Sequence, residues 1–155
     1  MKQTDTRRSM LLPDPRYSDQ MVTRFINTMM MNGKKETCYN IFYGAMDEIK
    51  RKTKEEGVTV WKKAMENAMP QVEVRSRRVG GATLQIPTEI RTQRKISLTM
   101  KWLILYARQR KGKSMRMKLA EELIAASKME GGAYKKKEDT HKMAEANKAF
   151  AHFRF

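Results

Sequence analysis

The chain has 155 residues, of which 40% are hydrophobic, and this suits one domain with a single modest core. Its 33 Lys and Arg residues outnumber its 17 Asp and Glu residues, and the resulting net charge of +16 opposes compaction unless a polyanion neutralises it. No apolar run approaches the roughly 18 residues of a membrane-spanning helix, and the N-terminus lacks the apolar centre of a secretory signal, so nucleic acid is a better candidate partner than an anionic membrane surface.

The first half of the chain predicts an arm followed by three helices. Residues 1–18 carry Pro13 and Pro15 without apolar periodicity, which predicts an extended basic arm. Apolar residues at helical spacing then predict helices from an N-cap at Asp19 to Asn32-Gly33, over 35–53, and from an N-cap at Thr59 to Pro70. Cys38 is the only cysteine and falls among apolar helical positions, so we expect a small buried hydrophobe and no disulfide.

The second half predicts a β-hairpin followed by three more helices. The hairpin is expected over 71–90, and the helices over 92–110, from an N-cap at Ser114 to Gly131-Gly132, and over 136–149. Trp102 and Tyr106 lie off the main apolar stripe of the fourth helix, where core packing is favoured over stacking on nucleobases. The last helix has a thin apolar stripe, so we expect a partner to order it and the tail that follows. The predicted fold class is mainly α: a six-helix domain with one protruding two-stranded β-hairpin between helices three and four.

The hairpin has two candidate registers. A two-residue turn at Gly80-Gly81 pairs Val79 with Ala82 and mixes arginines with apolar residues on one face. A three-residue turn from Gly80 to Ala82 pairs Val79 with Thr83 and separates the apolar face from the basic one. We favour the longer turn, because it lets one face pack while the other presents guanidinium groups.

Basic residues gather at the hairpin, at two turns and at the start of the last helix. Arginine forks match phosphate oxygens, and the glycine pair allows a phosphate backbone to approach closely. Each cluster alone is more often a solvated surface, but together they favour contact with a nucleic acid. The candidate RNA-binding residues are Arg7, Arg8, Arg16, Lys34, Lys35, Arg75, Arg77, Arg78, Arg91, Arg94, Lys95, Arg108, Arg110, Lys111, Lys113, Arg116, Lys135, Lys136, Lys137, Lys142 and Lys148.

The sequence offers little for catalysis or for a cofactor. His141 and His152 have no cysteine at metal-ligand spacing, and the chain contains no phosphate-binding glycine loop, GxSxG or HExxH motif. Glu121 and Glu122 have the pattern of charges on a helix surface. We therefore expect no enzymatic activity, no cofactor and no metal site.

Several stretches resemble small-subunit ribosomal protein seven of the bacterial and organellar type: VEVRSRRVGGATLQIP, ARQRKGKSM, KKKEDTHKMAEANKAFAHFRF, NGKKETC and LLPDP. The resemblance implies a structural protein of the small ribosomal subunit that binds the 3′ major domain of its 16S-type rRNA and starts assembly of the head. It also implies a hairpin near the exit-site tRNA and the mRNA exit path. The implied neighbours are head proteins nine and thirteen, and protein eleven across the mRNA exit path.

The resemblance extends to individual basic positions and to the division of the chain. Residues that match the family's basic positions are Arg75, Arg77 and Arg78 on the hairpin, Lys34 and Lys35 on the turn, and Arg108, Arg110, Lys113, Lys136 and Lys137 elsewhere. We divide the chain into an N-terminal arm over 1–18, one helical RNA-binding domain over 19–149 that includes hairpin 71–90, and a tail over 150–155. The expected location is the ribosome of the cytoplasm, with an organellar ribosome as the alternative. The alternative function is that of an architectural DNA-binding protein that uses its β-ribbon as an arm.

Overall fold

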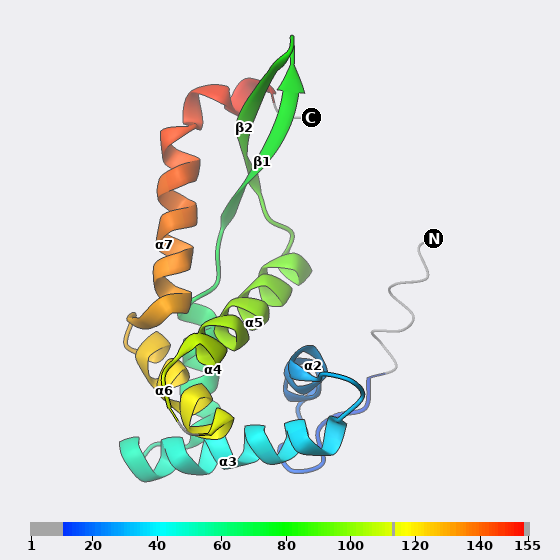
Figure 1. The fold of residues 1–155 in the computed structure, drawn as a ribbon, viewed down its shortest axis with the longest axis vertical. Coiled ribbons are helices and arrows are strands. Elements are labelled where there is room, and N and C mark those ends of the chain that lie inside the picture. Colours follow the sequence, from blue (N-terminus) through cyan, green and yellow to red (C-terminus); the bar gives the residue numbers. More distant parts are fainter. Residues whose placement is uncertain (1–10, 113, 154–155) are drawn as a thin grey trace.

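The computed structural model describes residues 11–112 and 114–153, and this part of the chain forms six α-helices and one two-stranded hairpin (Figure 1). The elements are α2 (Gln20–Met29), α3 (Lys35–Thr53), α4 (Gly57–Asn67), β1 (Val72–Val79), β2 (Ala82–Glu89), α5 (Thr92–Gln109), α6 (Met115–Ser127), α7 (Gly131–Ala146) and the 3-10 helix η1 (Lys148–Phe153). The two strands are antiparallel and lie between the third and fourth helices, α4 and α5. The predicted fold class is confirmed.

Local capping signals place several helix boundaries where the sequence predicts them. The Asp19 carboxylate accepts a hydrogen bond of 2.8 Å from the backbone N–H of Met21, and this caps α2. The Ser114 hydroxyl accepts from the N–H of Met117 and caps α6 in the same way. The second predicted helix coincides with α3 at both ends.

Two helices begin earlier than predicted, and in both cases a glycine allows close packing. The third helix begins at Gly57, where an added Cβ would lie 2.6 Å from the Met46 carbonyl oxygen on α3. The predicted N-cap Thr59 therefore lies inside α4. The last helix begins at Gly131 instead of residue 136, and a Cβ on Gly132 would lie 2.3 Å from the Tyr106 ring. Both glycines lie in the first turn of a helix, where the lack of a side chain lets the helix pack closely against a neighbour.

The core lies where α6 packs against α3, α4 and α5. At its centre, Phe25, Phe42 and Trp61 come from three helices and contact one another with ring centroids 5.6 to 5.8 Å apart. Cys38 is buried against this core, as predicted. Trp102 and Tyr106 are half-buried and pack against it, so core packing is confirmed for both. Among the described residues, no helix has both the length and the apolar character needed to cross a membrane.

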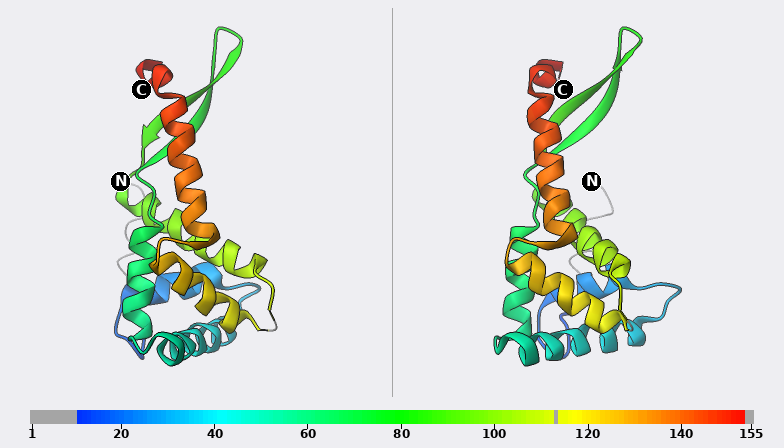
Figure 2. Two further views of the ribbon diagram at one scale, coloured as in Figure 1. Left: turned by 90° about the vertical axis from the view of Figure 1, so that its left-hand side faces the viewer. Right: turned by 60° about the vertical axis from the view of Figure 1, so that its left-hand side comes forward.

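The hairpin and the last helix extend away from this core on the same side. Helix α7 packs on α5, α6 and β1, and η1 packs on β2. Figure 2 shows the hairpin running alongside α7 and continuing past η1, so its turn forms one end of the molecule. The protein therefore has a packed helical base and a projecting ribbon that is supported along part of its length.

The hairpin adopts the shorter of the two candidate registers, and the favoured longer turn is wrong. Val79 pairs with Ala82, which places Arg75 opposite Ile86 and Arg77 opposite Leu84. Gly80 and Gly81 have φ values of +56° and +88°, the left-handed backbone that a two-residue turn requires at both positions. Charge and apolar residues share a face because most of the ribbon projects from the core, so neither of its faces is fully buried.

Candidate nucleic-acid interface

The outer half of the hairpin presents consecutive polar and basic side chains. Residues 75–78, Arg-Ser-Arg-Arg, are all exposed. No atom beyond the glycines' chain neighbours lies within 4 Å of the Cβ positions of Gly80 and Gly81, so among the described residues nothing covers the turn. A nucleic-acid backbone can therefore approach the arginines and the turn from solvent.

The base of the hairpin is built around a buried carboxylate that the sequence analysis did not single out. Glu73 on β1 pairs with Arg75 on the same strand at 2.6 Å and with Arg94 on α5 at 2.8 Å. Burial raises the pKa of Glu73, but hydrogen bonds from Arg94 and Arg75 outweigh this effect and hold the pKa below its ordinary value. The sequence does contain a signal for this contact: Glu73 lies two positions before Arg75, so the two side chains lie on one face of the strand.

The basic surface continues from the hairpin base onto the start of α5. Arg91 is exposed at the N-cap of that helix, and Lys95 one turn later donates a hydrogen bond to the side-chain oxygen of Gln71. Through Glu73 the structure brings Arg75 to Arg94, which shares the start of α5 with Arg91 and Lys95. This grouping connects the ribbon to the helical base.

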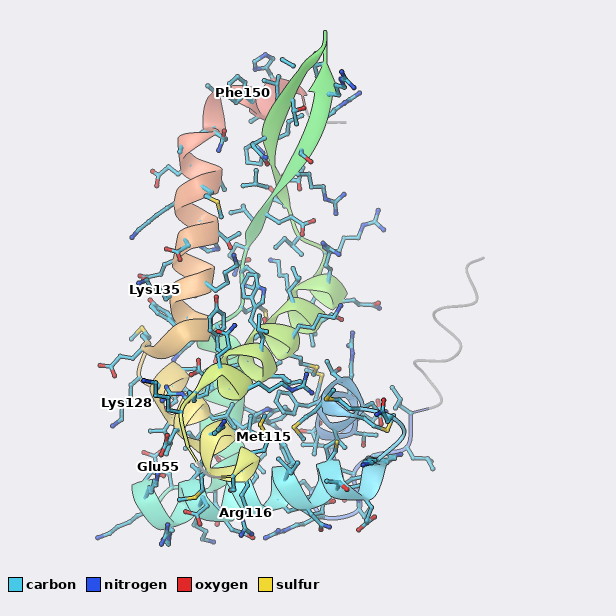
Figure 3. All side chains as sticks on the ribbon, in the orientation of Figure 1. Glu55, Met115, Arg116, Lys128, Lys135 and Phe150 are labelled. Atoms are coloured by element: carbon cyan, nitrogen blue, oxygen red, sulfur yellow. The ribbon has the colours of Figure 1, made fainter. Side chains whose placement is uncertain are left out.

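Other predicted residues lie exposed but apart from the hairpin base. Lys34 is exposed at the N-cap of α3 and Lys35 at its first residue, and the Lys35 ammonium lies 5.7 Å from the centroid of the Tyr39 ring. Figure 3 shows Arg116 beside α3, at the opposite end of the molecule from the hairpin, whereas Lys135 lies on α7. The further exposed members are Lys111, Lys142 and Lys148, with Lys136 half-buried. The predicted residues therefore spread over several surfaces.

Besides Arg75 and Arg94, the predicted arginines Arg16, Arg108 and Arg110 also make contacts within the described part of the protein. Arg16 forms an ion pair of 2.8 Å with Asp47, and its guanidinium lies over the rings of Tyr17 and Tyr43. Arg108 donates to the backbone carbonyl of Met29 at 3.0 Å. These contacts hold the two guanidinium groups against the protein surface.

The third internal arginine, Arg110, forms an ion pair of 2.6 Å with Glu122. The Glu122 side chain is 2% exposed and also accepts the backbone N–H of Ala133, in the first turn of α7. Glu122 is therefore a buried capping group, and its assignment as a helix-surface charge is wrong. The signal for burial is its position one residue before Leu123 and three after Leu119, on the side of α6 that packs against the other helices.

A histidine and a lysine of the last helix bind the segment that leads from the end of α4 into the hairpin. The Nε2 atom of His141 accepts the backbone N–H of Gln71 at 3.0 Å. Lys137 donates to the backbone carbonyl of Asn67 at 2.6 Å and lies over the Tyr134 ring. Burial, and then the charge of Lys137, lower the pKa of His141, which favours the neutral ring that can accept this bond.

The remaining predicted residues, Arg7, Arg8 and Lys113, lie outside the described part of the chain. Within the described residues, no group of three His, Cys, Asp or Glu side chains is placed to hold a metal ion. The hairpin, its arginine-rich base and the exposed lysines place the described residues in a class of protein: a basic helical protein with a projecting ribbon, whose charge suits a polyanionic partner.

Comparison with known proteins identifies the family. The model of the family described as Ribosomal protein S7p/S5e matches residues 1–148. The small ribosomal subunit protein uS7 of Cytophaga hutchinsonii is 59% identical over 155 residues, and the match covers 100% of both chains. That of Flavobacterium psychrophilum is 58% identical over 158 residues with the same coverage, and that of Gemmatimonas aurantiaca is 59% identical over 94% of this chain and 93% of its own.

The chain therefore belongs to the ribosomal protein S7p/S5e family of the bacterial type. It is a structural, non-enzymatic component of the small ribosomal subunit and an RNA-binding protein of translation. Membership of the small ribosomal subunit implies binding to ribosomal RNA.

Proposed function

We propose that the protein binds the 3′ major domain of the small-subunit rRNA and starts assembly of the head, with its hairpin near the exit-site tRNA and the mRNA exit path. The observation that carries this proposal is the projecting ribbon, which presents exposed residues 75–78 beside an uncovered glycine turn within the described residues. A ribbon of this shape can reach RNA that the helical base does not touch. The base meanwhile offers further lysines and arginines for the assembly site.

Family membership supports the neighbours proposed for this position. These are head proteins nine and thirteen, with protein eleven across the mRNA exit path. The relatives are bacterial, which favours a ribosome of the bacterial cytoplasm over an organellar one. The 3-10 helix η1 is a candidate contact for such a neighbour, because Phe150 lies on it beside the hairpin (Figure 3).

The alternative function, an architectural DNA-binding protein, is less well supported. Ribbons that bend DNA commonly insert an apolar or proline wedge between base steps at their tip. Val79 is the only large apolar residue at this turn, and it is half-buried. Arginines and glycines at the tip suit contact with a phosphate backbone better than intercalation.

A binding experiment separates the two functions. The protein is titrated with a transcript of the 3′ major domain and with duplex DNA of equal length, at several salt concentrations. We expect preference for the transcript and a loss of affinity of about 10³-fold or more between 50 and 200 mM salt, because roughly six to ten phosphate contacts release counterions. Tighter binding to the duplex, or a flat salt response, would contradict the proposal.

A deletion tests the division of labour between ribbon and base. Residues 75–85 are replaced by a short glycine linker, and the control is the double variant Lys63→Ala and Lys128→Ala on exposed positions away from the hairpin. We expect the deletion to keep a cooperative thermal transition, to weaken transcript binding only in part, and to impair exit-site tRNA or mRNA handling more. Loss of the cooperative transition would show that the ribbon is part of the folding unit.

A further inference from the structure

Glu73 is a buried acidic residue in an otherwise basic ribbon, and its contacts join two elements. Its side chain is 11% exposed, whereas those of Arg75 and Arg94 are 61% and 53% exposed. The Arg94 Nε–H donates to both carboxylate oxygens, at 3.1 and 2.8 Å. The Arg75 Nε–H donates to Oε1 at 2.7 Å, and its Nη2 lies 2.6 Å from the same atom.

These contacts occupy only one edge of each guanidinium. Each arginine carries five N–H donors, and Glu73 engages the Nε and Nη2 groups of Arg75 but only the Nε group of Arg94. The remaining Nη donors lie outside the carboxylate contact, on side chains that are more than half exposed. Two positive groups against one negative group leave this trio with a charge of +1, so an anion is still attracted.

We propose that Glu73 is a positioning residue that holds Arg75 and Arg94 as a two-guanidinium clamp for one phosphate of the RNA backbone. The proposal rests on the RNA-binding role proposed above and names a residue pair that performs it. Guanidinium groups match phosphate oxygens in a fixed fork geometry. Because Glu73 already orders both side chains, RNA binding loses less conformational entropy at this point. The clamp also joins β1 to α5, so a bound phosphate would fix the ribbon relative to the helical base.

Two simpler roles for Glu73 predict different effects of its substitution on RNA binding. If only total charge matters, Glu73→Gln raises the net charge from +16 to +17 and tightens binding. If Glu73 only ties the hairpin to α5, the substitution lowers stability but leaves the salt dependence of binding unchanged. The clamp predicts weaker binding in spite of the added positive charge.

The test compares Glu73→Gln with Glu66→Gln, which makes the same charge change at an exposed position on α4. Affinity for the 3′ major domain transcript and for a uridine homopolymer is measured over a range of salt. We expect Glu66→Gln to bind as the unaltered protein or slightly more tightly. Glu73→Gln should bind about 3- to 10-fold more weakly, and the slope of log affinity against log salt should fall by about one. Glu73→Gln binding as tightly as Glu66→Gln would overturn the clamp.

A second variant keeps the test decisive if Glu73→Gln does not fold. Arg94→Lys keeps the positive charge but loses the planar fork, so the clamp predicts a comparable loss of affinity with the circular dichroism of the unaltered protein. Binding of Arg94→Lys equal to that of the unaltered protein would refute the clamp. In NMR spectra, inorganic phosphate and then the homopolymer should shift the Nε–H signals of Arg75 and Arg94 together.

The outcomes separate this inference from the proposed function. If the unaltered protein shows no preference for the transcript, but Glu73→Gln still binds the homopolymer more weakly, the assignment to the 3′ major domain fails and the clamp stands. If the transcript is preferred and the two glutamine variants bind it alike, the clamp fails and the function stands.

Discussion

Substitution of Arg110 by methionine tests whether this arginine acts inside the protein or on the RNA. Methionine keeps the apolar stem but removes the charge that faces Glu122. The carboxylate then stays buried, with the Ala133 N–H as the donor that remains to it among the described residues. We therefore expect a loss of stability that exceeds any effect on RNA affinity.

The structure sets the size of this loss. Removing one partner of a fully buried ion pair costs about 3–5 kcal/mol. The Arg110 side chain is 30% exposed, so water can approach the pair from one side, and this favours the low end of the range, about 3 kcal/mol. For a domain of this size each kcal/mol lowers the Tm by roughly 2–4 °C, so we expect a decrease of about 6–12 °C.

Thermal denaturation followed by circular dichroism measures the effect. The control is Lys111→Met, which removes the same charge at the adjacent exposed position and should change stability by no more than about 0.5 kcal/mol. Adding Glu122→Met to Arg110→Met should recover part of the loss, because no unpaired charge is then buried. If Arg110→Met melts at the temperature of Lys111→Met but loses RNA affinity, the internal role is refuted and Arg110 contacts RNA.

Three further predictions concern packing, pH and order. Gly57→Ala should lower the free energy of unfolding by about 2 kcal/mol in chemical denaturation, because the added Cβ meets the backbone of Met46. Gly44→Ala should cost less, because its Cβ meets the flexible side chain of Arg116. Equal losses in the two variants would contradict this reasoning. Burial, and then the charge of Lys137, lower the pKa of His141 below its ordinary 6.5, so the unfolded chain binds more protons than the folded one. We therefore expect the Tm to fall as the pH drops below about 6.5. A His141→Gln variant whose Tm has the same pH dependence would refute this assignment. In amide exchange on the protein without RNA, we expect residues 143–150 to be weakly protected and α3 and α5 to be firmly protected, because the last helix has a thin apolar stripe. Strong protection of residues 143–150 would show that this segment needs no partner to be ordered.

Local sequence signals were sufficient for much of the fold. The N-caps Asp19 and Ser114 follow from side chains at the helix ends, and the bounds of α3 follow from apolar residues at helical spacing. The burial of Cys38 follows from its position among apolar residues at helical spacing. These features are decided by short-range contacts, which is why they are readable without the tertiary structure.

The glycines and the hairpin register depended on contacts that no local pattern contains. Gly57 and Gly132 resemble helix breakers in the sequence, but each lies in the first turn of a helix, where a distant segment packs against the position that a side chain would occupy. The favoured register assumed that the hairpin must bury one face. The structure leaves most of the ribbon outside the core, so the backbone preference of Gly80 and Gly81 decides the turn instead.

The sequence by itself determined that the protein is a basic helical domain with an arginine-rich hairpin, because composition, periodicity and turn residues are local properties. Only the tertiary structure decided what each charge does. Arg110 pairs with Glu122 on the following helix, and this ion pair is largely buried. Arg94 on α5 pairs with Glu73 on β1, and its guanidinium stays at the surface. The physical reason is that burial and ion pairing depend on which helices pack together, and packing joins residues that are far apart in the chain.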